Sequence, residues 1–499
     1  MGIVKVAFAS DFDGATETCP PPLHSCYPLV LDLDGTLIRT DLLLESALQY
    51  VRRKPIALFL LVFWALHGIA RLKHELSART DVAVDLLPVN DALINYARDA
   101  SRNGRTVVVA TAASKDLAAK VCMRFGFVSE VLASCDHINL KGNRKAQALR
   151  QRFPGGFTYA GDSYADLSVW REARFGVFAG RDQRLLDRLV RATALEADFS
   201  QWRDPTRDWI RALRLHQWAK NALVFLPLML AGHLLDIGGW ATCLGGFLAT
   251  GLAASATYII NDLLDLEADR QHWSKRNRPI ASGRIAIPEA AVGAILALTA
   301  GLTLALLTGG FPVLGALLLY CALTLTYSVY LKRIPILDVV LLATLFTMRL
   351  GIGALAAQVR LSAWLGVFSM FLFLSLALAK RSTEITRKCA AGASSANGRG
   401  YLAADAPLIA SLGVSSAIGS VLLMVLYLIQ EAFGDALYRS PQLLWAVPMF
   451  IGLWLGRIWL LCGRGSLNDD PVAFAVTDRI SIYLGAGVLI SFGAAAVIA

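Results

Sequence analysis

The sequence predicts an α/β domain built on a parallel sheet, followed by an all-α membrane domain of about nine transmembrane helices. Of the 499 residues, 56% are hydrophobic and 17% are charged, which is too apolar for a soluble protein of that length. Charged and apolar residues mix as far as about residue 215, and long uncharged runs such as 240–260 follow. In the first part, strand patterns alternate with helical patterns, which is typical of a parallel sheet covered on both faces.

The net charge of +10 would indicate nucleic-acid binding in a soluble protein. Basic loops that orient membrane helices explain it better here, so no nucleic-acid partner is expected. The chain has eight Cys and no CxxC pattern, which favours a reduced protein without disulfides. Its first residues, "MGIVKVAFASDFDG", make a poor signal peptide, so we expect the first domain to stay in the cytoplasm.

The elements of the first part follow from composition and pattern. Residues 1–27 are rich in Pro and small polar residues, which predicts a loose tail. The α/β domain is expected over residues 28–195. It has strands in "YPLVLDLDGT" (27–36), "SRNGRTVVVATAAS" (101–114) and "GGFTYAGDSYADLSVW" (155–170). Helical patterns lie between these strands.

One apolar run interrupts this domain. Residues 55–69, "PIALFLLVFWALHGI", form about four turns, which is short for a membrane span. We expect a helix of an inserted cap that is buried or rests on the membrane, and the sequence leaves open whether it contacts the bilayer.

A stretch rich in Trp and Arg, residues 196–218, precedes the membrane domain. This composition suits the headgroup layer, so the stretch is interpreted as an interfacial linker. The membrane domain is expected over residues 219–499. Its nine apolar segments lie near residues 221–238, 240–260, 286–309, 311–330, 336–357, 361–379, 408–430, 442–462 and 480–498.

The loops of this domain indicate its orientation. With the N-terminus inside, the loops at 261–285, 331–335, 380–407 and 463–479 also face inside, and the first three hold most of the loop Lys and Arg. The positive-inside rule therefore agrees with nine spans in an inner (plasma) membrane.

Two acids end the first predicted strand. Asp32 and Asp34 lie two residues apart on an extended chain and so point the same way. One carboxylate can attack phosphorus while the other handles the leaving-group proton. Thr111 is expected to end the second strand, where its hydroxyl can bind a phosphate oxygen, and Lys145 can neutralise phosphate charge.

The third strand ends in "GDSYAD", which supplies Asp162 and Asp166 as oxygen ligands for Mg²⁺. These signals, in this order, resemble the haloacid dehalogenase phosphatase family over residues 28 to about 195. The resemblance implies an aspartyl phosphate on Asp32 and a general acid/base at Asp34, with Thr111 and Lys145 holding the phosphoryl group. The implied magnesium ligands are Asp162 and Asp166 together with Asp32 and Asp34.

An earlier stretch, "SDFDGAT" (10–16), also carries Asp-x-Asp-Gly. It lacks the Thr-Leu pair after Gly14, and a Pro-rich tail follows it in place of a helix pattern. We therefore expect Asp11 and Asp13 to be non-catalytic.

The most informative stretch of the membrane domain is "YIINDLLDLEADRQHWSKRNRPIASGRI" (258–285). Its three acids are spaced i, i+3 and i+7, which puts them on one helical face at a cost in free energy unless a cation offsets them. Acids for Mg²⁺ followed by bases for phosphate oxygens suit a diphosphate substrate. The residues concerned are Asn261, Asp262, Asp265, Asp269, Lys275, Arg276 and Arg278.

A second loop and helix repeat this logic. Tyr327, Lys332 and Asp338 are expected at the same membrane face, where Asp338 could complete the metal site. Arg349 follows eleven residues after Asp338, about 16 Å deeper along a helix. An Arg inside a span is costly and marks function by default, although an Arg paired only for structure is the alternative.

These two loops resemble the UbiA superfamily of intramembrane prenyltransferases over about residues 219–499. Many members have two acids in the second loop, whereas this chain has only Asp338. The segments "HQWAKN" (216–221), "NDLLDLEADRQHWSKRNRPIASG" and "NDDPVAFAVTDR" (468–479) are most similar to the decaprenyl-phosphate phosphoribosyltransferase branch.

This branch implies that the metal-bound diphosphate belongs to phosphoribosyl pyrophosphate and that a polyprenyl (decaprenyl) phosphate is the acceptor. Mg²⁺ is expected on Asp262 and Asp265, with Asp269 or Asp338. Lys220, Arg276 and Arg278 are expected to hold phosphate oxygens of the donor. Arg349, Lys380 or Arg381 are expected to steer the lipid phosphate.

The two parts together suggest a bifunctional enzyme whose phosphatase domain removes the 5-phosphate of the transferase product. One alternative is transfer of a prenyl group from prenyl diphosphate to an aromatic or lipid acceptor. Another is a transporter or scaffold with a regulatory soluble domain. The sequence leaves open the lipid chain length, whether a homo-oligomer forms, and whether the phosphatase acts on the lipid product or on a soluble phosphate ester.

Overall fold

The computed structural model describes residues 26–54, 56–134, 140–200, 204–233, 235–390, 400–434, 438–467 and 471–497. Most of the predicted tail, with the "SDFDGAT" stretch, lies outside the described residues, and so do the first three residues of "NDDPVAFAVTDR". The chain forms two compact units. The first unit is Met1–Leu213 with Ile259–Gly293, and the second unit is Arg214–Tyr258 with Ala294–Ala499.

A six-stranded parallel sheet organises the first unit, which confirms the predicted α/β arrangement. The strand order is β3-β2-β1-β4-β5-β6, with β1 in the interior. Leu29 of β1 lies opposite Val107 of β2 on one side and Thr158 of β4 on the other. The strands are β1 (Leu29–Leu31), β2 (Val107–Ser114), β3 (Glu130–Ser134), β4 (Thr158–Gly161), β5 (Phe175–Phe178) and β6 (Ala194–Asp198).

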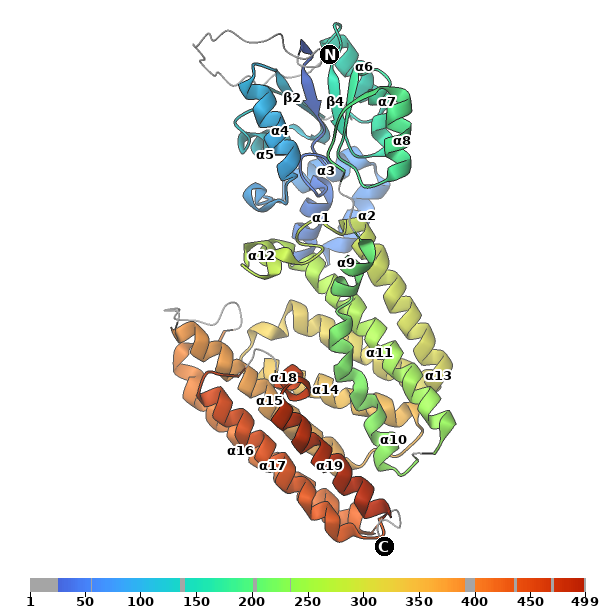
Figure 1. Cartoon of the computed structure of the whole chain (residues 1–499), viewed down its shortest axis with the longest axis vertical. Coiled ribbons are helices and arrows are strands. Elements are labelled where there is room, and N and C mark those ends of the chain that lie inside the picture. Colours follow the sequence, from blue (N-terminus) through green and yellow to red (C-terminus); the bar gives the residue numbers. More distant parts are fainter. Residues whose placement is uncertain are drawn as a thin grey trace. The chain divides into compact units, whose positions relative to one another are not determined.

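Both faces of this sheet are buried, because alternate residues of each strand face opposite layers of helices (Figure 1). Leu29 and Leu31 join a core with residues of α4 and α5, whereas Val30 joins a separate core with residues of α6, α7 and α8. The helices of these layers are α4 (Asp91–Arg102), α5 (Lys115–Met123), α6 (Asn143–Arg152), α7 (Leu167–Trp170) and α8 (Gln183–Ala192).

Three helices inserted between β1 and β2 form a cap: α1 (Leu42–Arg53), α2 (Ala57–Leu66) and α3 (Ile69–Ser77). The apolar run at 55–69 is therefore not one helix. Gly68 divides it with a φ of +113°, a conformation that favours glycine. The cap has its own small core of Tyr50, Ala57, Trp64 and Leu76.

The first unit also contains the segment that links two long helices, α11 (Ile237–Leu264) and α13 (Ile287–Val329). This segment includes α12 (Leu266–Gln271), whose Arg270 forms a buried ion pair with Glu45 of α1, at 2.6 Å. The helix α9 (Pro205–Ala212), in the predicted linker, contributes Asp208, which accepts a hydrogen bond from Arg284 at 2.9 Å. The predicted boundary at residue 195 falls inside β6.

The second unit is helical. Apart from parts of α11 and α13, it contains α10 (Leu226–Leu230), α14 (Leu337–Ala356), α15 (Ala363–Ala390), α16 (Ala406–Gln430), α17 (Ala446–Gly463), α18 (Pro471–Thr477) and α19 (Arg479–Val497).

Within the described residues, seven helices are long and apolar enough to cross a membrane, and one of them, the 43-residue α13, combines two of the nine expected segments. The segment near 221–238 is not a long helix: a 3₁₀ stretch, Leu215–Phe225, is followed by the five-residue α10, which begins beside Pro227. Pro cannot continue a helix from its interior, so it starts a new one here. The segments 286–309 and 311–330 form α13, interrupted at Gly310 (φ 65°, ψ −161°), where the sequence predicted a break.

Small residues allow close helix packing in the second unit. Gly413 of α16 lies against Trp459 of α17 and Leu378 of α15. The Trp459 indole donates a hydrogen bond to Ser375 Oγ at 2.9 Å, which fixes the ring. A methyl group on Gly413 would overlap the Trp459 ring.

We therefore expect Gly413→Ala to lower the melting temperature of the detergent-solubilised chain by several degrees, since overpacking costs about 1–3 kcal/mol. Gly366→Ala on α15 is the matched control, because no atom outside its own helix lies within 4 Å of the added carbon. Thermal unfolding followed by tryptophan fluorescence measures both. Equal melting temperatures for the two variants would contradict this packing.

Candidate active sites

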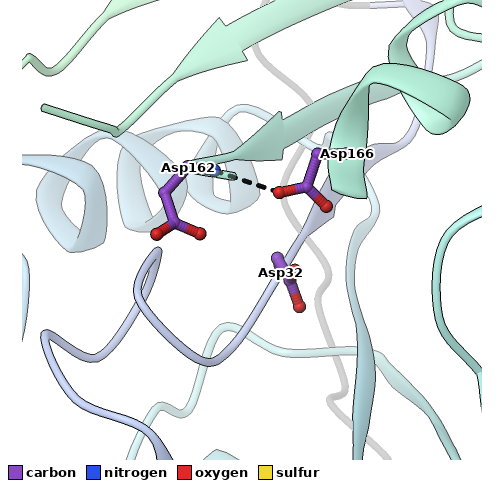
Figure 2. A group of neighbouring side chains, drawn as sticks. All are labelled: Asp32, Asp162 and Asp166. Atoms are coloured by element: carbon purple, nitrogen blue, oxygen red, sulfur yellow. Dashed lines mark hydrogen bonds between the residues drawn. The ribbon is translucent and has the colours of Figure 1, made fainter. Parts of the chain in front are cut away.

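The carboxyl edge of the sheet gathers the predicted phosphatase residues. Asp32 follows β1 and Asp162 follows β4, so the two neighbouring strands deliver both side chains to one place. Asp166 joins them from the next turn. Each of the three carboxylates has an oxygen within 4.8 Å of the other two, and they converge in Figure 2. Within the described residues, this is the one such group of His, Cys, Asp and Glu side chains. The donor set fits Mg²⁺.

Lys145 of α6 compensates this negative charge. Its ammonium lies 2.8 Å from Asp32 Oδ2 and 4.0 Å from Asp166 Oδ1, and its side chain is only 4% exposed. It also donates to the hydroxyl of Tyr159, which in turn donates to Asp166. Asp166 further accepts hydrogen bonds from the backbone and hydroxyl of Ser163. Asp166 is thus fixed by protein groups, and Asp32 remains directed at the cavity edge.

The chain turns sharply after Asp34. Gly35 has a φ of +77°, and a side-chain carbon there would collide with the Asp162 carboxylate, so this position requires glycine. Thr36 donates its hydroxyl hydrogen to Asp162 Oδ1 at 3.1 Å. The backbone N–H of Leu42, at the start of α1, donates to Asp34 Oδ1 at 3.0 Å. Through Thr36, the Asp-x-Asp-Gly-Thr motif therefore also positions Asp162, a candidate metal ligand that follows another strand.

Burial raises the pKa of three acids at this sheet edge, Asp32, Asp34 and Asp162. Burial is the main cause that raises the pKa of Asp32 to about 6, against the opposing effect of Lys145. Burial and the nearby Asp41 raise the pKa of Asp34 to about 7. Burial, followed by the charges of Asp166 and Asp32, also raises the pKa of Asp162. Asp34 can thus both give and take a proton near neutral pH.

The expectation that Thr111 ends the second strand is wrong, because β2 continues to Ser114. The Thr111 side chain is fully buried and accepts a hydrogen bond from the backbone N–H of Ala113. Ser114 lines the cavity, as does Lys73 of α3, whose ammonium donates to the Ala112 carbonyl oxygen. Ser114 could be suspected from its place at the strand end, whereas no sequence signal identifies Lys73.

A cavity of about 780 Å³ opens over the acids. Its polar floor includes Asp32, Asp34, Lys145 and Asp162, and its walls include apolar side chains of the cap. Residues 286–289, at the start of α13, complete the wall. Arg181, also in the wall, donates to the backbone carbonyls of Gly283 and Arg284. Segments from both halves of the sequence therefore build this cavity.

The second acid group differs from its prediction. Helix α11 ends at Leu264, and Asp265 (φ −99°, ψ 14°) separates it from α12, although the backbone hydrogen bonds from Asp265 to Asn261 and from Asp269 to Asp265 continue across this point. Arg278 Nη1 lies 2.9 Å from Asp262 and 2.5 Å from Asp269. Asp265 instead lies 4.0 Å from Arg52 of α1. Asp262 and Asp269 therefore converge on one cation, and Asp265 lies near another.

The convergence of Asp262 and Asp269 on one nitrogen atom shows that this point suits a positive charge. Both acids are buried, so their mutual repulsion must be offset locally. Their carboxylate oxygens are ligands of the kind that Mg²⁺ takes. Asn261 lies at the end of α11, where its carbonyl accepts the N–H of Asp265, and Arg276 is exposed in the following turn.

In the second unit, Asp338 begins α14 and is fully buried. Arg381 of α15 donates to Asp338 Oδ2 at 2.6 Å, and the hydroxyl of Tyr401 donates to Oδ1. Arg381 also donates to Glu384 and to the hydroxyl of Tyr327. Both oxygens of Asp338 are thus engaged, and Arg381 holds this acid in place. The sequence does not identify Tyr401 as a partner of Asp338, because Tyr401 lies outside the two acid-bearing loops.

Arg349 is buried at mid-helix in α14, as expected. Its guanidinium donates to Asn221 Oδ1 at 2.9 Å, to the Leu345 carbonyl at 2.7 Å and to the Tyr320 hydroxyl at 2.8 Å. These partners are all uncharged, so the positive charge is solvated without being neutralised by them. Lys220 lies on the same side of α14, 5.9 Å from the centre of the Phe346 ring, which the Arg349 guanidinium also faces.

The other two predicted bases also lie in the second unit. Lys332 is in a short 3₁₀ turn, Leu331–Arg333, between α13 and α14. Lys380 is in α15, next to Arg381, and is partly buried. Among the site residues predicted in this unit, Arg381 thus contacts both Tyr327 and Asp338 directly.

Comparison with known proteins identifies the helical part. Residues 223–482 match the UbiA prenyltransferase family. The chain belongs to the UbiA prenyltransferase family. Together with the apolar helices, this membership indicates a multi-pass membrane protein. The match includes Asp262, Arg278 and Asp338, so both acid loops lie inside the UbiA segment.

Two relatives extend the comparison. The chain is 40% identical over 470 residues to "Uncharacterized protein y4nM" of Sinorhizobium fredii, which covers 93% of this chain and 90% of that protein. That match includes both parts of the chain. This chain is also 36% identical over 186 residues to a decaprenyl-phosphate phosphoribosyltransferase of Corynebacterium glutamicum. The match covers 35% of this chain and 54% of the relative.

Among solved structures, a UbiA homologue from Archaeoglobus fulgidus bound to geranyl diphosphate (GPP) and Mg²⁺ has a TM-score of 0.43 at 16% identity. The similarity covers 57% of this chain and 99% of that one.

The raised pKa values predict how metal and pH act on the first unit. Without metal, protonated Asp32 and Asp34 stabilise the folded unit at any pH below the ordinary pKa of an Asp side chain. This stabilisation is lost as the pH rises through their raised pKa values of about 6 and about 7. Mg²⁺ needs the ionised form, so we expect it to raise the melting temperature more at about pH 8 than at about pH 5.5.

The variant Asp162→Asn tests whether this effect comes from the Asp32 group. Compared with the unaltered chain, it should lose the Mg²⁺-dependent increase in melting temperature. Asp99→Asn on α4, where the carboxylate is exposed, should retain it. An unchanged Mg²⁺ effect in Asp162→Asn would place the metal elsewhere.

Proposed function

We propose that this UbiA-family chain is a bifunctional enzyme. Its UbiA segment transfers 5-phosphoribosyl from phosphoribosyl pyrophosphate to a polyprenyl phosphate and releases pyrophosphate. Its first unit is a phosphatase of the haloacid dehalogenase type that removes the 5-phosphate of the lipid product. Similarity to a decaprenyl-phosphate phosphoribosyltransferase supports the first activity, and the Asp32 group supports the second.

One observation carries the coupling of the two activities. The cavity over Asp32 is walled partly by residues 286–289, which belong to the UbiA segment. Arg270, next to Asp269, is also ion-paired with Glu45 of the cap. A phosphatase built against the acid loop of a transferase is well placed to receive a phosphorylated product of that transferase.

The phosphatase step follows from the charges around Asp32. An Asp32 oxygen attacks phosphorus, the bond from phosphorus to the ribose 5-oxygen breaks, and protonated Asp34 gives its proton to that oxygen. Asp34 then takes a proton from water, which attacks the aspartyl phosphate, frees inorganic phosphate and restores Asp32. Lys145, 2.8 Å from Asp32, offsets the phosphoryl charge throughout.

The transferase step breaks the bond from the anomeric carbon to pyrophosphate and forms one to a lipid phosphate oxygen. Asp262 and Asp269 would hold Mg²⁺, which supplies charge stabilisation for the departing pyrophosphate. Arg278 and Arg276 are available for the diphosphate oxygens, and Lys220 for those of the sugar phosphate. Arg349, whose guanidinium donates to the uncharged groups of Asn221, Leu345 and Tyr320, is suited to an anionic group of the lipid.

Location follows from the same residues. The loop 261–285 and the turn 331–335 are rich in bases, which by the positive-inside rule favours the cytoplasmic side of an inner membrane. The first unit would then be cytoplasmic, where phosphoribosyl pyrophosphate is available.

A substitution at Asp32 tests the coupling. The purified chain in lipid nanodiscs, given labelled phosphoribosyl pyrophosphate and polyprenyl phosphate, should yield a lipid-linked ribose and free phosphate. Asp32→Asn should accumulate the lipid-linked ribose 5-phosphate instead, with at least a hundred-fold slower phosphate release, since the nucleophile is gone. Thin-layer chromatography and mass spectrometry separate the two lipids. Identical products from both proteins would refute the coupling.

The acid loop provides a second test. Asp262→Asn should slow pyrophosphate release at least a hundred-fold, and Asp265→Asn should have a smaller effect, because Asp262 and Asp269 are the two acids that converge on Arg278 and would hold the metal. The family also favours a second candidate, transfer from a prenyl diphosphate. Pyrophosphate release from phosphoribosyl pyrophosphate, and not from geranyl or farnesyl diphosphate, is the expected result. The reverse preference would establish the prenyl reaction.

A further inference from the structure

Helix α2 of the cap has an unusual distribution of apolar side chains. Ala57, Leu61 and Trp64, spaced i, i+4 and i+7, form the face that packs against the rest of the cap. The other described side chains of this helix are apolar as well but face outward. The exposed side chains are Ile56, Phe59, Leu60, Val62, Phe63, Leu66 and, at the start of α3, Ile69, with exposed fractions from 45% to 82%.

This patch is too continuous for a helix that faces water. Helices at a protein–water surface carry polar residues opposite their buried stripe, and α2 has no charged residue between Ala57 and Leu66. Its ten residues extend only about 15 Å, half of a hydrocarbon core of about 30 Å. The helix therefore cannot span a bilayer, but it can lie in the interface.

The charged residues near α2 in the sequence indicate which kind of surface it binds. No Asp or Glu occurs between Glu45 and Glu75, whereas the same stretch contains the five bases Arg52, Arg53, Lys54, Arg71 and Lys73. Of these, Arg53, Lys54 and Arg71 are exposed. A positively charged segment around an apolar surface matches anionic lipid headgroups over acyl chains. The same unit also contains the ends of α11 and α13, two of the candidate membrane spans, so its surface is tethered near a bilayer.

We propose that α2 is an in-plane membrane helix, which docks the cap of the first unit onto the anionic lipid surface. The neighbouring α3 then connects this surface to the phosphatase cavity. Ile69, Lys73, Leu76 and Ser77, spaced along one face of α3, line the cavity, while Leu72 packs with the core that α2 shares.

This arrangement also defines a substrate class for the Asp32 site, and here it rests on the proposed phosphatase function. The cavity combines a charged floor with apolar cap residues such as Leu43, Leu44 and Ile69. A phosphate monoester anchored in the bilayer presents both a charged head and an apolar stem. We therefore assign this site to lipid-anchored phosphate esters in preference to soluble ones.

A photo-crosslinking experiment on the full chain tests the docking. p-Benzoylphenylalanine replaces Phe63 in protein reconstituted in nanodiscs of phosphatidylcholine and phosphatidylglycerol. Met123, which is 63% exposed on α5 of the same unit, is the matched control position. Irradiation should give lipid adducts at position 63 at least ten-fold more often than at position 123, measured by mass spectrometry. Equal adduct yields, no lipid adducts, or crosslinks from position 63 to a second copy of the chain would overturn the proposal.

Activity tests the substrate class separately. The double variant Phe59→Asp/Phe63→Asp should hydrolyse p-nitrophenyl phosphate at the unaltered rate. It should dephosphorylate the lipid that accumulates with Asp32→Asn at least ten-fold more slowly. Equal rates on that lipid would overturn the assignment. If that lipid does not accumulate, or the unaltered chain hydrolyses neither compound, the proposed function fails and the assignment with it, while the crosslinks still decide whether α2 binds the bilayer.

Discussion

Buried carboxylates, each compensated by a nearby cation, are the constraint on which both parts of this chain depend. Lys145 serves the acids around Asp32, and Arg278 serves Asp262 and Asp269. Taking a carboxylate out of water is so costly that its partner must be fixed with it. The helices and loops that carry the cations are therefore as necessary to each site as those that carry the acids.

The same principle connects the two sites physically. Asp34 accepts a hydrogen bond from the first residue of α1, and Glu45, one turn later, pairs with Arg270 of α12. Arg270 directly follows Asp269, whose carboxylate contacts Arg278. A short series of backbone and ion-pair contacts thus runs from Asp34 to the acid loop of the UbiA segment.

Sequence patterns succeeded where a local rule decides the outcome. Alternating strands and helices predicted the parallel sheet, and the positions of Asp32, Lys145 and Asp162 relative to those elements placed them at one sheet edge. The apolar segments 286–309 and 311–330 were expected separately, and α13 is interrupted between them at Gly310, whose positive φ glycine tolerates. The patterns failed where a partner far away in the chain decides. The three acids of the loop 261–285 were expected to act together, but Asp262 and Asp269 contact Arg278 while Asp265 lies near Arg52 of α1.

The sequence by itself determined the residue types, the order of the two parts and the membrane character of the second, because composition and short-range periodicity are properties of the chain alone. Tertiary structure decided which charges meet. Arg278 lies between two acids, Arg381 holds Asp338, and residues 286–289 close the cavity over Asp32. These contacts join residues separated by 9, 16, 43 and more than 250 positions, and no periodic pattern carries information over the longer of these separations.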